Sequence, residues 1–549
     1  MQYYCLTVLN RFMNRFYGLL FLFFTAGVAV AQVSYLPLNR EIMARYEPFL
    51  DSVGSTMHTS LKPYLSNEVA ANAPYDSLNL HVLKNTKFNR SLAGRKLFQE
   101  HLLEVKKNDF HLYADFIFNF SFGNEYSASK KFYANSRGIY AGGTIGRGLS
   151  FSTYFMETQQ KFPDYVASYI AFAGVIPGQG TAKEFKGGGK DFAYSAAEVT
   201  YALKKYFTFQ LGTGKHFIGD GYRSLLLSDI AFNYPYFKVE MNIWKIKYTC
   251  MWTAYQDLLV KPPPNMNPDD FSYRKKYSTY HYLDFNIGKK NRASIGIVEA
   301  VVWRSDSVRG TGIDFNYLNP IIFMRPVENS LSSPDNVLLG LNSKFKINSR
   351  NVLYGQVLFD EFNLKELKAR EGSYANKFGF QVGIKSYHVF GIKNLRVQTE
   401  FNYVKPYTYS HRSSLTSYGH YNEPLAHVQG ANFYESVNFL NYHYKQWFFQ
   451  AELMLVVTGL DTAGINYGKN IFKSYTQPAQ FTGNYMAQGL KTNITYLDFK
   501  IGYLLNPVYN LRIEAGITNR NATNNFGKTQ NNFIYFGIKT DINNRYYDF

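Results

Sequence analysis

The chain has 549 residues, of which 18% are aromatic and 18% are charged, and its formal net charge is +19. So many aromatic residues exclude a disordered chain, the lack of a Gly-X-Y period excludes collagen, and two cysteines exclude a disulfide scaffold. A mean hydropathy of −0.27 excludes a bundle of membrane helices, so the composition favours a transmembrane β-barrel.

Residues 1–31 are expected to form a cleaved secretory signal peptide. They contain no acidic residue, and a basic start is followed by an apolar run over 18–30 that is short for a bilayer span. Small residues then supply a cleavage site, which we place after Ala31. Translation could begin at Met1 or at Met13, because the segment from Met13 onward is a complete signal by itself. This segment predicts export, and with the barrel composition it predicts the outer membrane of a Gram-negative bacterium.

Residues 32–108 differ from the rest of the chain in their hydrophobic pattern. Several prolines interrupt the first part, whereas Leu97, Leu102 and Val105 lie near one face of a helix predicted over 91–107. We therefore expect a periplasmic or barrel-plugging segment with a short helix, rather than an independent domain.

Residues 109–549 alternate apolar and polar side chains with a period of two. In one clear example, Leu511 and Ile513 alternate with Arg512 and Glu514. Outer-membrane strands show this pattern because one face meets lipid and the other lines the lumen. The fold class is therefore all-β, a transmembrane antiparallel barrel of about eighteen strands (16–18). The candidate strands are 110–122, 137–146, 148–158, 190–203, 206–216, 236–245, 246–256, 277–288, 292–303, 336–347, 351–362, 376–389, 395–406, 432–445, 447–459, 494–506, 509–520 and 531–542.

Some positions fit this pattern poorly. The strands predicted over 292–303 and 351–362 place Glu299 and Asp360 on mixed faces, and an apolar run over 169–176 falls in a long loop. In the well-phased strands, charged residues are expected to line the lumen and could close it by ion pairing. These residues are Arg396, Glu400, Asp498, Lys500, Arg512 and Glu514.

The chain ends in Tyr546-Tyr547-Asp548-Phe549. We expect Phe549 to close an aromatic-rich last strand. A terminal Phe in that place resembles the signal that the outer-membrane barrel assembly machinery reads.

A glycine-rich run over 214–229 could suggest a phosphate cradle. Its glycines do not have the spacing of a nucleotide-binding loop, so we predict a tightly turned loop inside the barrel mouth, with its buried charges paired. Ligand contact is the alternative for this loop. The candidate structural residues are Asp220, Tyr222, Arg223 and Asp229.

The segment 404–435 concentrates tyrosine and histidine. Aromatic faces stack on the CH faces of sugars, so this segment could contact a surface glycan. The alternative is an ordered extracellular loop without a ligand, and the histidines lack the usual spacing of zinc ligands. The candidate glycan contacts are Tyr407, Tyr409, His411, Tyr418, His420 and Tyr421.

Several specific runs are spread over essentially the whole mature chain: 214–229, 317–320 with 325–326, 358–362, 405–409, and 424–427 with 430–433. These runs resemble the Wzi-like outer-membrane barrels, and best the branch of RemB-type gliding motility proteins. The resemblance implies a non-catalytic eighteen-stranded barrel that serves capsule retention or surface gliding, and it carries no defined sugar site.

No Gly-x-Ser-x-Gly or His-Glu-x-x-His motif is present, so we expect neither an enzyme nor a cofactor or metal. The expected function is a gliding motility accessory that contacts surface polysaccharide or adhesin machinery. The alternatives are a lectin that anchors capsular or exopolysaccharide, and a diffusion channel. Expected partners are outer-membrane lipid and lipopolysaccharide, the barrel assembly machinery, and surface polysaccharide or motility adhesins. Nucleic acid is not expected, because the basic residues are spread among the strands.

Overall fold

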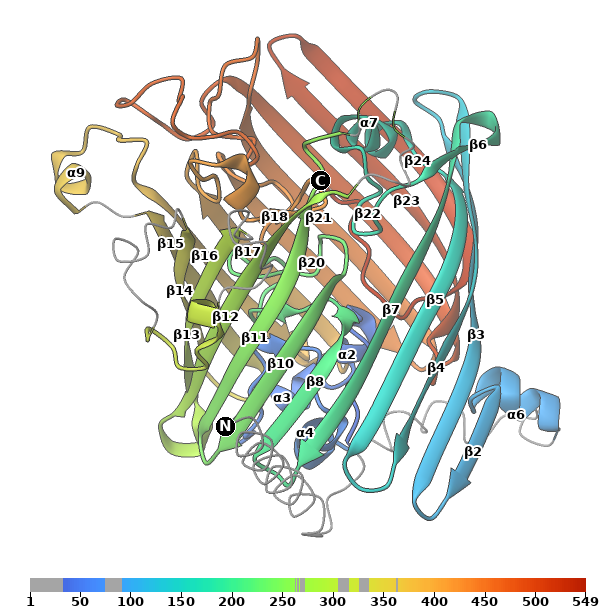
Figure 1. Ribbon diagram of the computed structural model, residues 1–549. Coiled ribbons are helices and arrows are strands. Elements are labelled where there is room, and N and C mark those ends of the chain that lie inside the picture. The colour runs from blue at the N-terminus through green and yellow to red at the C-terminus, as the bar shows by residue number, and fades with distance from the viewer. Residues whose placement is uncertain are drawn as a thin grey trace, which may run out of the picture.

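A computed structural model describes residues 33–74, 91–261, 263, 266, 272–304, 315–324, 335–361 and 364–549. Within them, eighteen antiparallel strands form one closed barrel (Figure 1), which confirms the predicted fold class. Each of the eighteen predicted strands overlaps an observed one. In chain order they are β3 (Phe110–Glu125), β4 (Lys130–Ile145), β5 (Leu149–Lys161), β7 (Gly189–Leu203), β8 (Phe207–Gly214), β10 (Tyr234–Ile243), β11 (Ile246–Asp257), β12 (Arg274–Ile287), β13 (Ala293–Arg304), β14 (Asn336–Lys346), β15 (Asn351–Glu361), β16 (Lys377–Tyr387), β17 (Leu395–Val404), β20 (Phe433–Tyr444), β21 (Trp447–Leu460), β22 (Leu490–Asn506), β23 (Leu511–Asn524) and β24 (Gly527–Thr540).

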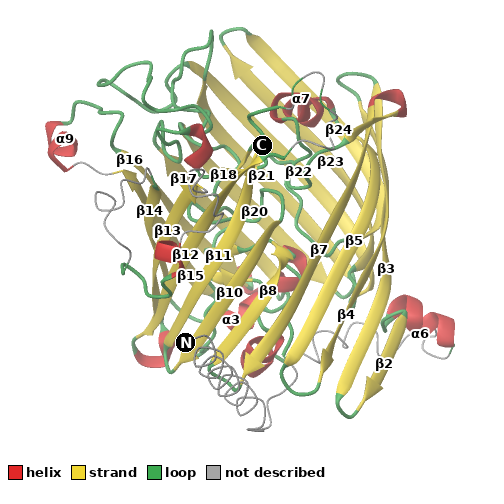
Figure 2. Ribbon diagram, viewed as in Figure 1, coloured by secondary structure: helices red, strands yellow, loops and turns green. Residues whose placement is uncertain are grey.

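Shorter elements lie inside the barrel and at its ends (Figure 2). The helices are α2 (Arg40–Ala44), α3 (Glu47–Leu50), α4 (Ser66–Asn72), α6 (Leu92–Phe98), α7 (Asp164–Ala173) and α9 (Leu364–Ala369), with 3-10 turns at Lys186–Gly188, Lys289–Asn291, Phe315–Leu318, Val389–Gly391 and Ser414–Thr416. The short strands are β1 (Leu61–Lys62), β2 (Leu103–Lys107), β6 (Lys183–Phe185), β9 (Phe217–Ile218), β18 (Gly419–His420) and β19 (Glu423–Pro424). Among the described residues, no helix has the length and apolarity needed to span a bilayer. The predicted signal peptide lies outside the described residues.

The alternation of side chains sets the two faces of the wall. In β22 and β23, Phe499 and Ile517 are half exposed on the outside, whereas the neighbouring Asp498 and Thr518 are buried inside. Short turns join the strands at the end where the N-terminal segment lies, and longer loops extend from the other end (Figure 1). In outer-membrane barrels the short turns are periplasmic and the long loops extracellular. We name the two ends of the barrel accordingly.

The segment before the barrel differs from the predicted helix over 91–107. Helix α6 ends at Phe98, and β2 pairs with residues 110–114 of β3. The helix prediction is therefore wrong beyond Phe98. Leu103 and Val105 alternate with charged residues, and that period of two suits the strand that forms.

The end of the chain also differs from its prediction. Strand β24 ends at Thr540, and residues 541–549 enter the lumen instead of extending the strand. They begin beside Arg512 at the periplasmic end and finish beside Tyr169 of α7 at the extracellular mouth. Phe549 therefore does not close the last strand, and that prediction is wrong. Recognition of the terminal Phe by the barrel assembly machinery stays a prediction.

Candidate functional site

The lumen is filled by four segments from distant parts of the sequence. They are the N-terminal segment 33–74, the loops 215–233 and 405–432, and the tail 541–549. The leucines 225–227 belong to an apolar cluster that includes inward side chains of β10 to β15, β17 and β20. Burial of this apolar surface stabilises the filled state of the lumen.

Charged residues of the wall pair mainly with these segments. Glu47 of α3 contacts Lys385 at 3.0 Å and also contacts Arg396. Glu400 accepts hydrogen bonds from the backbone N–H groups of Tyr222 (2.7 Å) and Arg223 (3.0 Å). Among the charged lumen residues that were expected to pair with one another, Arg512 and Glu514 form a direct ion pair at 3.0 Å. The plugging segments supply partners that alternation within strands cannot reveal.

Asp220 connects the first loop to the N-terminal segment. Its carboxylate accepts from Thr59 Oγ1 at 2.5 Å and lies 3.5 Å from Lys344 Nζ. Burial raises the pKa of Asp220, but Lys344 and then Lys62 outweigh it, so the pKa lies below its usual range. The charged form of Asp220 is therefore a stable part of the plug.

Arg223 holds the C-terminal tail in the lumen. Its side chain is 1% exposed, with Nη2 3.1 Å from Asp548 and Nε 3.4 Å from Glu435. Tyr222 OH donates to the same Asp548 carboxylate at 2.7 Å. His427 Nε2 lies 2.6 Å from Glu435. This network explains why a long polar side chain can be buried here.

Asp229 joins both ends of the chain. It accepts hydrogen bonds from Tyr546 OH and Asn544 Nδ2, each at 2.7 Å. Arg40 of α2 donates to the same Tyr546 oxygen at 2.8 Å, and its guanidinium lies 4.3 Å from the centre of the Tyr222 ring. The four residues predicted for a structural loop thus all make interior contacts with distant segments.

The predicted glycan contacts lie mostly in the interior. Tyr407, Tyr409, His411, Tyr418 and His420 are at most 6% exposed. The Tyr407 hydroxyl donates to the Asn466 carbonyl at 2.9 Å. The hydroxyls of Tyr409 and Tyr418 donate to the carbonyls of Leu225 at 2.9 Å and Leu226 at 2.6 Å, respectively. Their loop folds over 215–233 instead of projecting outward, so as placed these five rings present no open face. Tyr421 alone of the six is partly exposed.

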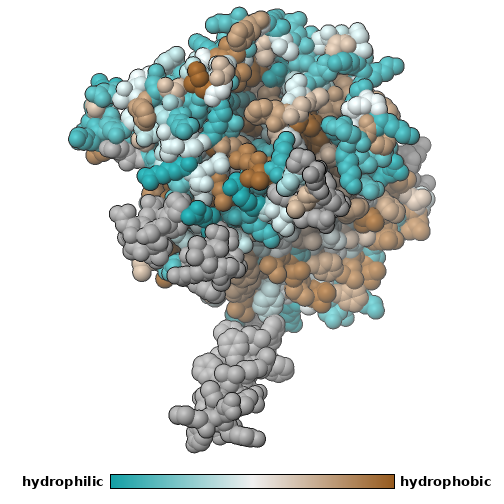
Figure 3. All heavy atoms as spheres, turned by 45° about the horizontal axis from the view of Figure 1, so that its top comes forward, coloured by the Kyte–Doolittle hydropathy of each residue, from teal (hydrophilic) through white to brown (hydrophobic). Residues whose placement is uncertain are grey.

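The extracellular mouth carries a patch of partly exposed aromatic rings, which we call the mouth patch: Tyr169, Phe232, Tyr273, Tyr421 and Phe549. The Tyr169 and Phe549 rings lie 4.8 Å apart, and those of Phe232 and Tyr421 lie 4.7 Å apart. Tyr169, Tyr273 and Tyr421 also pack on one apolar cluster. Figure 3 turns this end toward the viewer and shows apolar residues among hydrophilic ones.

Of the five residues of the mouth patch, Tyr421 alone was among the predicted glycan contacts. Tyr169 lies in α7, within the apolar run that fitted no strand. Asp164 in the first turn and a left-handed Gly174 after Ala173 are the signals that could have identified this helix. Nothing local to Phe549 indicates that it reaches the mouth.

Glu423 links three loops at the mouth by hydrogen bonds. Its carboxylate accepts from Gly178 N at 2.7 Å and from Phe232 N at 3.0 Å. Lys215 Nζ donates to the carbonyls of Gly178 (2.8 Å) and Asp229 (3.2 Å). Burial raises the pKa of Glu423 to about 8 and lowers that of Lys215 to about 8. Burial therefore favours the uncharged form of both groups.

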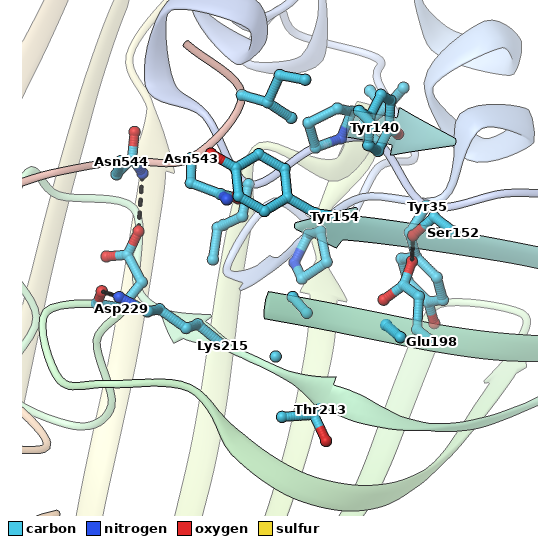
Figure 4. Close-up of a pocket in the computed structure, with 18 of the residues that line it drawn as sticks. Tyr35, Tyr140, Ser152, Tyr154, Glu198, Thr213, Lys215, Asp229, Asn543 and Asn544 are labelled. Atoms are coloured by element: carbon cyan, nitrogen blue, oxygen red, sulfur yellow. Dashed lines mark hydrogen bonds between the residues drawn. The ribbon is translucent and has the colours of Figure 1, made fainter. Parts of the chain in front are cut away.

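A cavity of about 80 Å³ lies between the N-terminal segment and strands β4, β5, β7 and β8 (Figure 4). Tyr140, Tyr154 and Tyr194 line it, with Glu198 and Lys215. The Glu198 carboxylate accepts hydrogen bonds from Ser152, Gln210 and Tyr236. The space suits a few water molecules rather than a sugar ring. Within the described part of the chain, no cluster of His, Cys, Asp and Glu could hold a metal ion.

The fold and the filled lumen define a class of protein: a plugged β-barrel like those of bacterial outer-membrane proteins. No protein-family model and no curated protein matches the chain. Among solved structures, Wzi of Escherichia coli is similar with a TM-score of 0.53 and 12% identity, over 92% of this chain and 99% of that one. Wzi is described as a carbohydrate-binding outer-membrane β-barrel involved in group 1 capsule assembly. The chain therefore has a Wzi-like fold.

Two further structures are less similar. OccAB2 of Acinetobacter baumannii is 11% identical, with a TM-score of 0.41 over 78% of this chain and 97% of that one. OprD of Pseudomonas aeruginosa is 11% identical, with a TM-score of 0.42 over 82% of this chain and 99% of that one.

Proposed function

We propose that this protein holds extracellular polysaccharide at the outer face of the membrane, without catalysis. The observation that carries the proposal is the mouth patch, where Tyr169, Tyr421 and Phe549 present partly exposed rings above a filled lumen. Such rings bury the CH faces of sugars while sugar hydroxyls stay in contact with water or polar groups. The packed plug beneath them holds the rings in place, which lowers the entropy cost of binding.

The likeness to Wzi, which is described as carbohydrate-binding, agrees with this proposal. A diffusion channel is disfavoured, because four segments fill the lumen and pair with its walls. The gliding role rests on the RemB-type sequence resemblance. Under our proposal, the protein would serve gliding by holding polysaccharide or adhesin machinery at the mouth.

The direct test measures binding of purified protein to the extracellular polysaccharide of the producing cells. Tyr421 has a left-handed backbone with φ of 52°, which asparagine tolerates, so Tyr421→Asn removes the ring without a new backbone strain. We expect this variant to bind at least several-fold more weakly, and Tyr421→Phe to bind like the unaltered protein.

Phe390 offers a matched control at the periplasmic end. It is 92% exposed and also left-handed, with φ of 54°, so Phe390→Asn makes the same exchange away from the mouth. Unchanged binding by Tyr421→Asn, or an equal loss in Phe390→Asn, would remove support for the mouth patch.

A deletion strain then separates the biological roles. Shed polysaccharide with normal movement would favour an anchoring lectin. Lost movement with normal polysaccharide staining would favour a motility role through adhesin machinery.

A further inference from the structure

Two extracellular loops, 364–376 between β15 and β16 and 461–489 between β21 and β22, are joined by four hydrogen bonds. In Figure 1, α9 and its loop lie across the mouth from α7. The bonds run from Tyr374 N to the Phe481 carbonyl (3.0 Å), from Gly483 N to the Glu371 carbonyl (2.6 Å), and from Asn484 N and Nδ2 to the Gly372 carbonyl (2.9 Å each). Each loop therefore fixes the backbone of the other.

Gly372 permits this close approach of the two loops. Its φ is 65°, in the left-handed region that favours glycine. A Cβ at this position would lie 2.7 Å from the carbonyl oxygen of Asn484 and 2.8 Å from its backbone nitrogen. A larger residue would push the loops apart, so their contact is specified by the sequence.

The segment held in this way carries exposed aromatic rings. Phe481 and Tyr485 are 62% and 64% exposed, and the Phe481 ring lies 5.4 Å from the ring of the partly exposed Tyr374, at 83°. We call Tyr374, Phe481 and Tyr485 the loop platform. A single exposed ring is ordinary, but several rings on a backbone fixed by hydrogen bonds are typical of a binding surface.

The loop platform and the mouth patch are attached to the same interior loop, 405–432. The ring of Tyr374 lies 6.4 Å from that of Tyr407, and Tyr407 N donates to the Gly468 carbonyl at 2.9 Å. Tyr421 of the mouth patch belongs to the same loop. Because this loop is packed into the lumen, the two aromatic surfaces keep a fixed separation.

Charge beside the loop platform favours an acidic ligand. Lys368 and Arg370 are exposed immediately before the joined residues. The acidic residues of this loop are Glu371, which is exposed, and Glu366, which accepts a hydrogen bond from Ser373. Basic residues outnumber acidic ones here by three to two, within a chain whose formal net charge is +19. This balance attracts acidic sugars rather than repelling them.

We propose that the loop platform is a second binding surface, which takes a further stretch of an acidic polysaccharide chain whose first stretch lies on the mouth patch. This proposal rests on the proposed function, because both surfaces bind the same polymer. A repeating chain presents the same sugars at intervals, so one chain engages both surfaces. The second contact is then intramolecular and raises the overall affinity.

The test uses purified full-length protein in detergent and the extracellular polysaccharide of the producing cells, as long chains and as short fragments. Phe481→Ser/Tyr485→Ser removes the two exposed rings. It is expected to weaken binding of long chains by about tenfold or more, because the link between two sites is lost. Short fragments cannot span both surfaces. They should occupy two sites on the unaltered protein and one on this variant.

Tyr126→Ser/Phe526→Ser is the matched control for the rings. These side chains are 51% and 84% exposed in the extracellular turns β3–β4 and β23–β24, away from the loop platform. The control should bind long chains and fragments like the unaltered protein. An equal loss in the control, or two fragment sites remaining in Phe481→Ser/Tyr485→Ser, would overturn the proposal.

Lys368→Glu/Arg370→Glu tests the acidic character of the ligand. We expect weaker binding of the native chains, and little change for chains whose carboxylates have been reduced to alcohols. Unchanged binding of native chains, or an equal loss in Lys491→Glu/Lys528→Glu at other exposed lysines, would exclude an acidic ligand at this surface.

Tyr421→Asn separates this proposal from that for the mouth patch. Loss of fragment binding confined to Phe481→Ser/Tyr485→Ser would support the loop platform and overturn the mouth patch. Loss confined to Tyr421→Asn would do the reverse.

Discussion

Replacing Arg223 by methionine is expected to release the C-terminal tail. Methionine fills much of the same space but leaves the buried carboxylates of Asp548 and Glu435, at 3.1 and 3.4 Å, without this cation. Removing one partner of a buried ion pair costs about 3–5 kcal/mol. Because His427 still lies 2.6 Å from Glu435, we expect the lower part of that range. Opening of the tail should then rise by roughly 100-fold.

The assay is hydrogen exchange of residues 541–549, with digestion by a carboxypeptidase as a second readout. Arg223→Met combined with Asp548→Asn should regain part of the protection, because the variant then buries one charge fewer without a partner. Lys491→Met, at an exposed position, should exchange like the unaltered protein. Unchanged protection of the tail in Arg223→Met would refute the assignment of Arg223 as its anchor.

Three further outcomes follow from the plug. Deleting residues 541–549 should leave membrane insertion intact, because β24 is complete at Thr540, but it should raise ion conductance in planar bilayers; failed insertion would contradict this. Tyr409→Phe removes the hydrogen bond to the Leu225 carbonyl and should cost about 1–3 kcal/mol of plug stability, seen as faster loop proteolysis, while polysaccharide binding stays unchanged. Burial raises the pKa of Glu423 to about 8, so its stabilising contribution is present at acidic pH and is lost as the pH rises toward 8. Loop proteolysis should therefore increase with pH, and Glu423→Gln should flatten that profile; an unchanged profile would exclude Glu423 as the cause.

The barrel could be predicted from the sequence because its cause is local and periodic. Each strand meets lipid on one face, so Phe499 and Ile517 recur at every second position regardless of what the lumen contains. The strand count follows from the turns that interrupt this alternation. Where a strand departs from it, as at Glu299, the cause is a contact with a segment that is distant in the sequence.

The filling of the lumen could not be predicted in the same way. Arg223 and Asp548 are 325 positions apart, and no pattern within either segment indicates the other. The tyrosines of 405–432 also resemble an exposed aromatic loop, since a tyrosine suits both a wet surface and a buried site where its hydroxyl has a partner. The buried site is distinguished from the exposed loop by the carbonyls of Leu225 and Leu226, which accept the tyrosine hydrogen bonds. These carbonyls lie in another loop.

The order in which these contacts form bears on the function. Arg40, Asp229 and Tyr546 meet in one cluster, although Arg40 and Tyr546 are 506 positions apart. Contacts between residues so far apart in the sequence form late in folding, because the entropy cost of closing the intervening loop must be met before they add stability. The mouth patch needs the same late step, since Phe549 reaches Tyr169 only when the tail lies in the lumen. A barrel without its tail would thus both conduct ions and lack part of its aromatic surface. The conductance and polysaccharide-binding assays should therefore change together when residues 541–549 are removed, and separately when Tyr421 alone is replaced.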